Sequence, residues 1–509
     1  MEHKIDRISE LPDSILEHIL SFIHTKQTLQ LSILSKRWQR VWALFPIPDF
    51  EQHLPNEKEQ EIQRKKEDFR NFVERSLLAH YRQRLNINKF RLHMKLDESD
   101  YAVVNRWIDF AIECNVKELN LDISLRIDQK RYELPERVLV ANSITELKLH
   151  MCKLKSFSGD INLSSLKKLV FSVEVEESQL VQTLIDSCRD IEDMTFECCN
   201  GLKSIRVLCL PKLKAIALLQ NSELESVEIE ASNLESLVLK FNSLPCQINL
   251  GPCKNLKTLV LYSCRITDKW LHDVLSKHRL IECLDLANCS MLKRIKISSH
   301  RMKSLTIISC HNLVEVDIVT PNLHRLEYEG EVISFSLNSS SLSEVILFFS
   351  GGSPLNAEMI EFLSKLSQPK LLTWTLGEDE TLKIAETLRT AIPCPLYNVK
   401  ELKLIVYSIP TREIHEVVDV LLWICPLLEI LFIERRYQGT LDNISFKFSY
   451  GNPIYKVKNR NCCKRLPVLC WRHCLKSVKI ANSKGSVEEE TLKKYFFNNA
   501  KILESFHYL

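Results

Sequence analysis

The chain has 509 residues, and its 68 basic side chains nearly balance its 65 acidic ones, which leaves a formal net charge of +3. This balance gives no support for nucleic acid or an anionic membrane as the main partner. Apolar residues make up 45% and charged residues 26%, as is ordinary for a folded soluble protein. Glycine is scarce, at 10 residues, and neither G-x-G-x-x-G nor a Walker A sequence occurs. No phosphate-binding loop and no cofactor is therefore predicted.

Residues 6–45 are expected to form three short helices around one apolar cluster. Pro12 suits a first helical turn, where a missing N–H is not needed. Apolar residues recur at helical spacing over 15–23, and the third helix carries the stripe Leu34, Trp38, Val41 and Trp42. A unit of about 40 residues barely supports its own core. These side chains therefore either face a partner or pack on the rest of the chain.

The residues of this stretch resemble the F-box, the module that docks onto the Skp adaptor of cullin-RING ubiquitin ligases. The resemblance rests on L-P, I-L and I-L pairs followed by the run L-S-K-R-W. It implies that some of these residues touch the adaptor and that others hold the three helices together. The residues so implied are Leu11, Pro12, Ile15, Leu16, Ile19, Leu20, Leu34, Ser35, Trp38 and Trp42.

The F-box is expected to occupy residues 1–50, and residues 51–84 read as a connector. Residues 57–70 are mostly charged and suit a solvated helix or loop. An apolar stripe at helical spacing follows, made of Phe69, Phe72, Val73, Ser76, Leu77 and Tyr81. We expect this helix to seat the F-box against the segment that follows.

Residues 85–440 repeat the pattern apolar-x-x-apolar-x-apolar, the strand signature of leucine-rich repeats. So many copies predict an α/β solenoid with parallel strands on its concave side. Copies begin at Val116, Ile144, Leu166, Ile191, Leu213, Leu224, Leu234, Leu256, Ile281, Leu292, Met302, Leu313 and Leu323.

The spacing of the copies predicts what lies on the outer side of the solenoid. Between 281 and 323 the copies begin only 10 or 11 residues apart, so every second copy, at Leu292 and Leu313, should be an outer strand that replaces a helix. Outer helices are expected at 179–188, 268–277 and 357–366.

Five cysteines occupy a recurring place, three residues after the last apolar position of a repeat: Cys152, Cys199, Cys264, Cys289 and Cys310. This is the Asn/Cys position of the leucine-rich repeat. We expect buried, reduced thiols there rather than a disulfide framework.

Residues 441–509 are expected to cap the solenoid. A strand at 475–480 precedes a helix whose buried face should be Leu492, Tyr495 and Phe496, and a second strand follows at 503–506. The segment from Cys470 to Phe506 resembles the FBD domain that ends many plant F-box/leucine-rich-repeat proteins. Together with VNRWIDFAIECNVKELNLDI, this resemblance covers nearly the whole chain.

Metal binding and catalysis receive little support. The densest cluster of possible ligands is Cys462, Cys463, Cys470, His473 and Cys474, but it lacks the C-x-x-C spacing of structural zinc. No nucleophile signature stands out. No metal site and no catalytic residue are predicted.

The resemblance implies a substrate receptor of an SCF-type ubiquitin ligase, without chemistry of its own, whose partners are a Skp-type adaptor and an unknown target protein. The alternative is a non-catalytic leucine-rich-repeat scaffold that binds the adaptor or other proteins without promoting degradation. The target is expected on one row of strand residues: Lys148, Val238, Val260, Asp285, Thr306 and Glu327.

The expected location is the nucleus or the cytoplasm, because the polar start MEHKIDRISE does not read as a signal peptide. The most apolar run, 417–433, contains Asp419, Pro426 and Glu429. It reads as a helix followed by a strand rather than as a membrane span, which needs about 20 mostly apolar residues.

Overall fold

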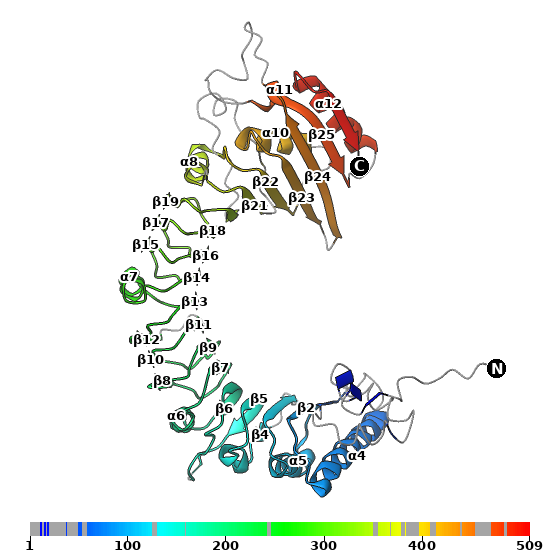
Figure 1. The fold of residues 1–509 in the computed structure, drawn as a ribbon, viewed down its shortest axis with the longest axis vertical. Helices are drawn as coiled ribbons and strands as arrows, with labels where there is room; N and C mark the ends of the chain where they lie inside the picture. Colours follow the sequence, from blue (N-terminus) through cyan, green and yellow to red (C-terminus); the bar gives the residue numbers. More distant parts are fainter. Residues whose placement is uncertain are drawn as a thin grey trace, which may run out of the picture. The chain divides into compact units, whose positions relative to one another are not determined.

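The structure is a computed structural model that describes residues 11–12, 15–16, 18–19, 37, 49–52, 59–124, 130–157, 159–241, 246–349, 355–366, 368–377, 382, 396–407, 414–437, 440–452, 470–482 and 486–508. The chain divides into two compact units, Met1–Leu256 and Lys257–Leu509. Figure 1 labels most of the helices and strands of both. Among the described helices, none has the length and apolar character needed to cross a membrane.

The first unit is built on a parallel sheet in the order β1–β2–β3–β5–β6–β7–β9–β11, with the short β4 added beside β5. Along each strand buried and half-exposed residues alternate, because successive side chains point to opposite faces. The strands are β1 Asp49–Glu51, β2 Lys89–Lys95, β3 Glu118–Ser124, β4 Tyr132–Glu133, β5 Glu146–Leu154, β6 Lys168–Val175, β7 Asp193–Glu197, β9 Ala215–Leu219 and β11 Ser236–Lys240.

The segments between these strands are first helical and then extended. The helices are α4 Glu59–Gln83, α5 Tyr101–Glu113 and α6 Ser178–Ser187, with short 3-10 turns η1 Glu98–Asp100 and η2 Glu136–Val140. The expected helix at 179–188 is thus confirmed as α6. A second, three-stranded parallel sheet follows, made of β8 Ser204–Leu208, β10 Ser226–Glu230 and β12 Gln247–Leu250.

Helix α4 joins this unit as an outer segment and not only as a connector. β1, which precedes it, already pairs with β2, and Phe50 of β1 packs edge-on against Phe72 of α4 at 5.4 Å. Val73 and Leu77 are fully buried, as predicted. Tyr81, at the end of the same stripe, is 43% exposed, and its ring lies beside Phe110 of α5.

The second unit contains a parallel sheet in the order β13–β14–β16–β18–β20–β21–β22–β23. Its strands are β13 Thr258–Tyr262, β14 Cys283–Ala287, β16 Ser304–Ile308, β18 Arg325–Gly330, β20 Glu344–Phe349, β21 Leu371–Leu376, β22 Glu401–Val406 and β23 Ile430–Tyr437.

The outer side of this unit is mixed, as the repeat spacing predicts. β15 Arg294–Ser298, β17 Glu315–Val319 and β19 Ser334–Asn338 form a separate parallel sheet, which confirms the outer strands expected after Leu292 and Leu313. The expected helices are confirmed as α7 Asp268–Lys277 and α8 Ala357–Lys365 (Figure 1). The run 417–433 is a helix followed by a strand, α10 Ile414–Ile424 and β23.

The sheet of the second unit ends in antiparallel strands and a helical layer. β24 Thr440–Tyr450 runs antiparallel to β23 and to β25 Leu475–Ala481, and β26 Ser505–Tyr508 runs parallel to β25. The helices are α11 Trp471–Cys474 and α12 Ser486–Asn499. Leu492 and Phe496 are fully buried as predicted, whereas Tyr495 is only half-buried.

The five repeat cysteines are buried and free, which confirms the prediction of reduced core thiols. The residue before each of them has a positive φ, so the chain turns sharply there: Met151, Cys198, Ser263, Asn288 and Ser309. The Cys289 thiol donates to the Leu261 carbonyl of the strand before it, at 3.5 Å. Burial raises the pKa of Cys152 to about 12, so its sulfur stays a protonated donor.

Asn221 occupies the equivalent turn after β9. Its side-chain amide makes stronger hydrogen bonds there than a cysteine thiol does. Its side-chain amide donates to the Phe196 carbonyl at 2.9 Å and accepts from the Cys199 amide at 2.9 Å. Sequence analysis missed it, although it stands three residues after Leu218 and Asn is the other residue of that consensus position.

We expect Cys289→Ser to lower the free energy of unfolding by about 1–3 kcal/mol, because the hydroxyl would be buried with poor hydrogen bonds. The exposed Cys209, also in a turn with positive φ, supplies the matched control Cys209→Ser, which should leave stability unchanged. Chemical denaturation measures both. Fast alkylation of Cys289 in the native protein would contradict its burial.

Candidate binding surfaces

Five of the ten residues assigned to the adaptor interface are described, at the start of the first helix. Pro12 and Ile15 are exposed, Ile15 by 44%, while Leu11 and Ile19 are half-exposed. Leu16 is fully buried. The remaining five lie outside the described residues: Leu20, Leu34, Ser35, Trp38 and Trp42.

Backbone hydrogen bonds fix the start of this helix. The Pro12 carbonyl accepts from the amides of Ile15 and Leu16 at 3.0 and 3.1 Å. The Arg37 guanidinium donates to the Leu11 carbonyl at 2.5 Å. Pro12 and Ile15 therefore project from an anchored turn, so their apolar surface is available to a partner.

In the first unit, Lys148 and Val238 occupy equivalent positions of one row across the strands. The register carries this row through the residues Arg91, Asn120, Lys148, Val170, Thr195, Ala217 and Val238. The alternate residues of these strands are buried, so the row lies on the face away from the core.

The part of this face on β1–β5 is charged, and its charged side chains largely pair with one another. Its ion pairs are Arg91–Asp49 at 3.4 Å, Lys89–Glu118 at 3.7 Å and Lys148–Glu146 at 3.4 Å, and His93 Nδ1 is hydrogen-bonded to the Asp122 carboxyl group at 2.8 Å. Lys148 would have to leave its carboxylate to bind a partner. Exposed pairs of this kind contribute little to stability, about 0–1 kcal/mol.

In the second unit, Val260, Asp285, Thr306 and Glu327 are consecutive register partners on β13, β14, β16 and β18. The structure therefore brings these four predicted residues into one row. Glu327 accepts from Arg325 at 3.1 Å, and the same guanidinium reaches Glu344 on β20 at 3.0 Å.

The row continues past the last predicted residue. Its next members are Ile346, Thr373, Lys403 and Phe432 on β20, β21, β22 and β23. Lys403 lies over the Phe432 ring at 5.6 Å and pairs with Glu434 at 2.8 Å. The hydrogen bond from Lys403 lowers the pKa of Glu434 although burial opposes it, so this carboxylate stays ionised. The predicted row ended at Glu327, and target capture was predicted between residues 116 and 350, a range that includes β20 but not β21–β23.

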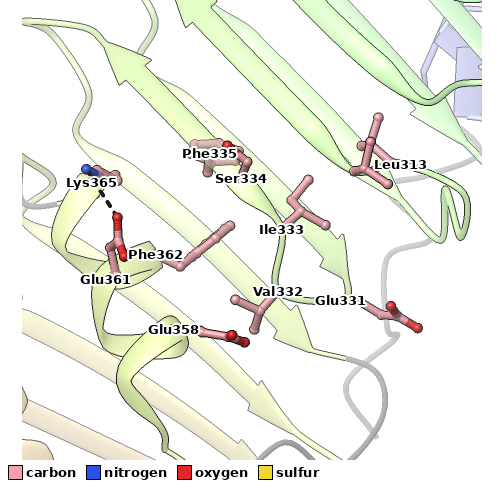
Figure 2. Close-up of a pocket in the computed structure, with 11 residues that line it drawn as sticks. Leu313, Glu331, Val332, Ile333, Ser334, Phe335, Glu358, Glu361, Phe362 and Lys365 are labelled. Carbon is pink, nitrogen blue, oxygen red and sulfur yellow. Dashed lines mark ion pairs between the residues drawn. The ribbon is translucent and has the colours of Figure 1, made fainter.

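A groove lies on the outer side of the second unit where β19 meets α8 (Figure 2). Its volume is about 610 Å³. Phe362 points from α8 toward Phe335, at 4.9 Å between ring centroids, and Lys365 pairs with Glu361 at 3.8 Å. The groove follows from geometry, because a helix here succeeds an outer strand and is roughly twice as thick. The other lining residues are Leu313, Val314, Glu331, Val332, Ile333, Ser334 and Glu358.

The cysteine–histidine cluster is only partly described. Cys474 and His473 are buried in α11, and the Cys474 thiol donates to the Cys470 carbonyl at 3.4 Å. Cys462 and Cys463 lie outside the described residues. Within the part of the chain that the structure describes, no group of His, Cys, Asp and Glu side chains could hold a metal ion.

Two family models match this chain, and together they cover most of its N-terminal and repeat region. The F-box domain model matches residues 8–49. The model described as the LRR domain of At1g61320/AtMIF1 matches residues 77–245 and 234–434, more than half of the chain.

Curated relatives from Arabidopsis thaliana carry the same two modules in their names. The putative F-box/LRR-repeat protein At3g18150 is 27% identical over 310 residues, 60% of each chain. The F-box/FBD/LRR-repeat protein At5g56420 is 28% identical over 292 residues, 55% of this chain and 65% of its own. The match thus spans less than two thirds of the length of either relative.

Among solved structures, the circular LRR protein CroV588 aligns with 63% of this chain and 55% of its own, at 12% identity and a TM-score of 0.31. The family is established by the sequence models, which find an F-box followed by leucine-rich repeats in one chain. The chain belongs to the plant F-box/leucine-rich-repeat proteins, whose Arabidopsis members are named F-box/LRR-repeat and F-box/FBD/LRR-repeat proteins.

Proposed function

We propose that the protein is the substrate-recognition subunit of an SCF-type cullin-RING ubiquitin ligase. The F-box binds a Skp-type adaptor, and the strand face of the repeats binds a target protein. The observation that carries the proposal is the union, in one chain, of an F-box at residues 8–49 with repeat strands whose outward side chains stand in continuous register.

In this role the chain does no chemistry of its own. It raises the local concentration of target lysines at the conjugating enzyme that the ligase recruits, so its contribution is proximity. The target is recognised by side chains that alternate with the buried leucines, and these can vary without disturbing the core.

Proximity labelling with the intact chain and with a version that lacks residues 1–50 tests the proposal. A target should be labelled by both and should accumulate in cells only with the truncated version. A partner that is labelled by both and accumulates with neither favours the rival function, a scaffold that binds proteins without promoting their degradation.

We expect the double variant Asp285→Lys/Glu327→Lys to lose target labelling and to keep adaptor capture. Both side chains stand on the same row of the second unit, so the two substitutions reverse its charge. The matched control is Asp317→Lys on β17, which reverses a charge on the outer sheet and leaves the row of Asp285 and Glu327 unchanged. Retention of every partner by the double variant would move the recognition surface elsewhere.

A further inference from the structure

The outer sheets have edge strands that lie beside a helix, and a strand edge with free backbone groups can pair with a further strand. At two of these junctions the helix closes the edge with a side chain. Gln182 of α6 accepts from the Arg206 amide of β8 at 3.1 Å and donates to the Arg206 carbonyl at 2.9 Å. Asp268 of α7 accepts from the Lys293 and Arg294 amides at the start of β15, at 2.8 and 3.2 Å. These side chains occupy the places that an added strand would need.

The junction between β19 and α8 is built differently. β19 is the last strand of its sheet and pairs only with β17. The Ser334 amide donates to the Val314 carbonyl at 3.2 Å, and the Asn338 carbonyl accepts from the Thr320 amide at 3.0 Å. Because backbone groups alternate in direction along a strand, those of the residues between point away from β17, to the side of α8.

The backbone groups on this free edge are the Ile333 carbonyl and the amide and carbonyl of Phe335 and of Leu337. Within the described part of the chain, none of these groups has a hydrogen-bond partner. Ile333 and Phe335 line the groove of about 610 Å³ opposite Phe362 of α8 (Figure 2). The open edge of β19 therefore faces a hollow, where the edges of β8 and β15 face a capping side chain.

The edge and the groove fit a short extended segment. β19 has 5 residues, and a rise of about 3.3 Å per residue makes its edge about 16 Å long, enough for a segment of about five residues. The side chains of an added strand would point alternately into the groove and out to solvent. The groove side is apolar, because Phe335 and Phe362 are buried and Val332 and Ile333 are half-exposed.

The charges that line the groove are mostly negative. Three carboxylates stand against one cation, Lys365, which is 3.8 Å from Glu361. On the sheet side, the outward residues of β17 next to β19 are also acidic, Glu315 and Asp317, and cations stand one strand further away, on β15. A basic side chain on an added strand is therefore attracted, and an acidic one is repelled. The three lining carboxylates are Glu331, Glu358 and Glu361.

We infer that the free edge of β19 binds an extended segment of a partner protein by strand addition. The segment alternates apolar side chains, which enter the groove, with lysine or arginine, which face the carboxylates of α8. In this mode of recognition main-chain hydrogen bonds supply affinity, and the side chains supply specificity. The outer edge is separate from the strand face to which the proposed function assigns the target, so it gives the chain a second binding site.

Fluorescence anisotropy with the full chain and two labelled peptides, SVKVKVS and SVEVEVS, tests the charge preference. The basic peptide should bind, and the acidic peptide should bind at least about tenfold more weakly. Glu358→Lys should weaken binding of the basic peptide severalfold. Asp273→Lys is the matched control, because Asp273 is an exposed carboxylate on the outer helix α7, and it should leave binding unchanged.

Backbone methylation of the basic peptide tests the strand hydrogen bonds on the unmodified chain. Successive N–H groups of a strand point to opposite sides, so only every second one can face β19. One peptide is N-methylated at both lysines, and the other at the second and third valines. One of the two should lose binding by about tenfold or more, and the other should bind like the parent peptide.

A basic peptide that does not bind the unmodified chain overturns strand addition at this edge. So do two methylated peptides that bind alike, or a Glu358→Lys chain that binds the basic peptide as well as the Asp273→Lys chain does. These results bear on the outer edge alone, because adaptor capture and target labelling report on other residues.

Discussion

Phe496→Ala should unfold the C-terminal end of the second unit at markedly lower denaturant concentration than the unmodified chain requires. The Phe496 side chain is fully buried, and its ring lies 5.9 Å from both Trp471 and Phe506 and 6.2 Å from Phe448. Truncating a buried phenylalanine costs about 3–5 kcal/mol, through lost burial and the cavity left behind. Urea denaturation followed by tryptophan fluorescence measures this loss, with Trp471 as a local reporter.

The adjacent Phe497 provides the control, because it is 49% exposed and belongs to the same helix. Phe497→Ala removes the same atoms and should cost well under half as much. Adaptor capture should stay normal in both variants, since the F-box is at the other end of the chain. Equal denaturation midpoints for the two variants would show that α12 does not hold the sheet end in place.

Pro12→Ala/Ile15→Ala should weaken capture of a Skp-type adaptor by about one to two orders of magnitude. Burying an aliphatic side chain of this size is worth roughly 1.5–3 kcal/mol, and about 1.4 kcal/mol is a tenfold change in affinity. Both residues are exposed in the free chain, so their truncation removes little from the fold. Surface plasmon resonance with the immobilised adaptor reads out the effect.

Val140→Ala is the control for this measurement, because Val140 is 43% exposed in the repeat region and outside the F-box. Adaptor affinity should be unchanged in that variant. Undiminished capture by the double variant would remove Pro12 and Ile15 from the interface.

Residue periodicity was enough to predict most of the repeat architecture. The repeat copies that begin at Leu292 and Leu313 predicted the outer strands, because copies that begin 10 or 11 residues apart leave no room for a helix in each repeat. The same spacing at Leu213, Leu224 and Leu234 marks the outer sheet β8–β10–β12, which the sequence analysis did not assign. The spacing that predicts these outer strands was therefore present in the sequence, but the sequence analysis did not use it.

The exposure of Tyr81 could not be predicted from the local sequence. Tyr81 shares the apolar spacing of α4, but the exposure of each stripe residue depends on how α5 packs beside it. Individual copies of the repeat motif were named only as far as Tyr328, although the solenoid was predicted to continue to residue 440. The same pattern recurs at Leu342-Val345-Leu347, Val399-Leu402-Leu404 and Leu428-Leu431-Ile433, on β20, β22 and β23.

The outer sheets also affect which turns of each unit can unfold locally. Where β15–β17–β19 faces β14–β16–β18, every turn is hydrogen-bonded to its neighbours along two separate ladders. A single turn cannot detach without breaking both ladders at once, whereas a turn that carries a helix such as α7 is tied to its neighbours by one ladder and by side-chain packing. We therefore expect local opening, amide exchange and proteolytic nicking to be faster in the helix-bearing turns than in the two-ladder turns, which should open together.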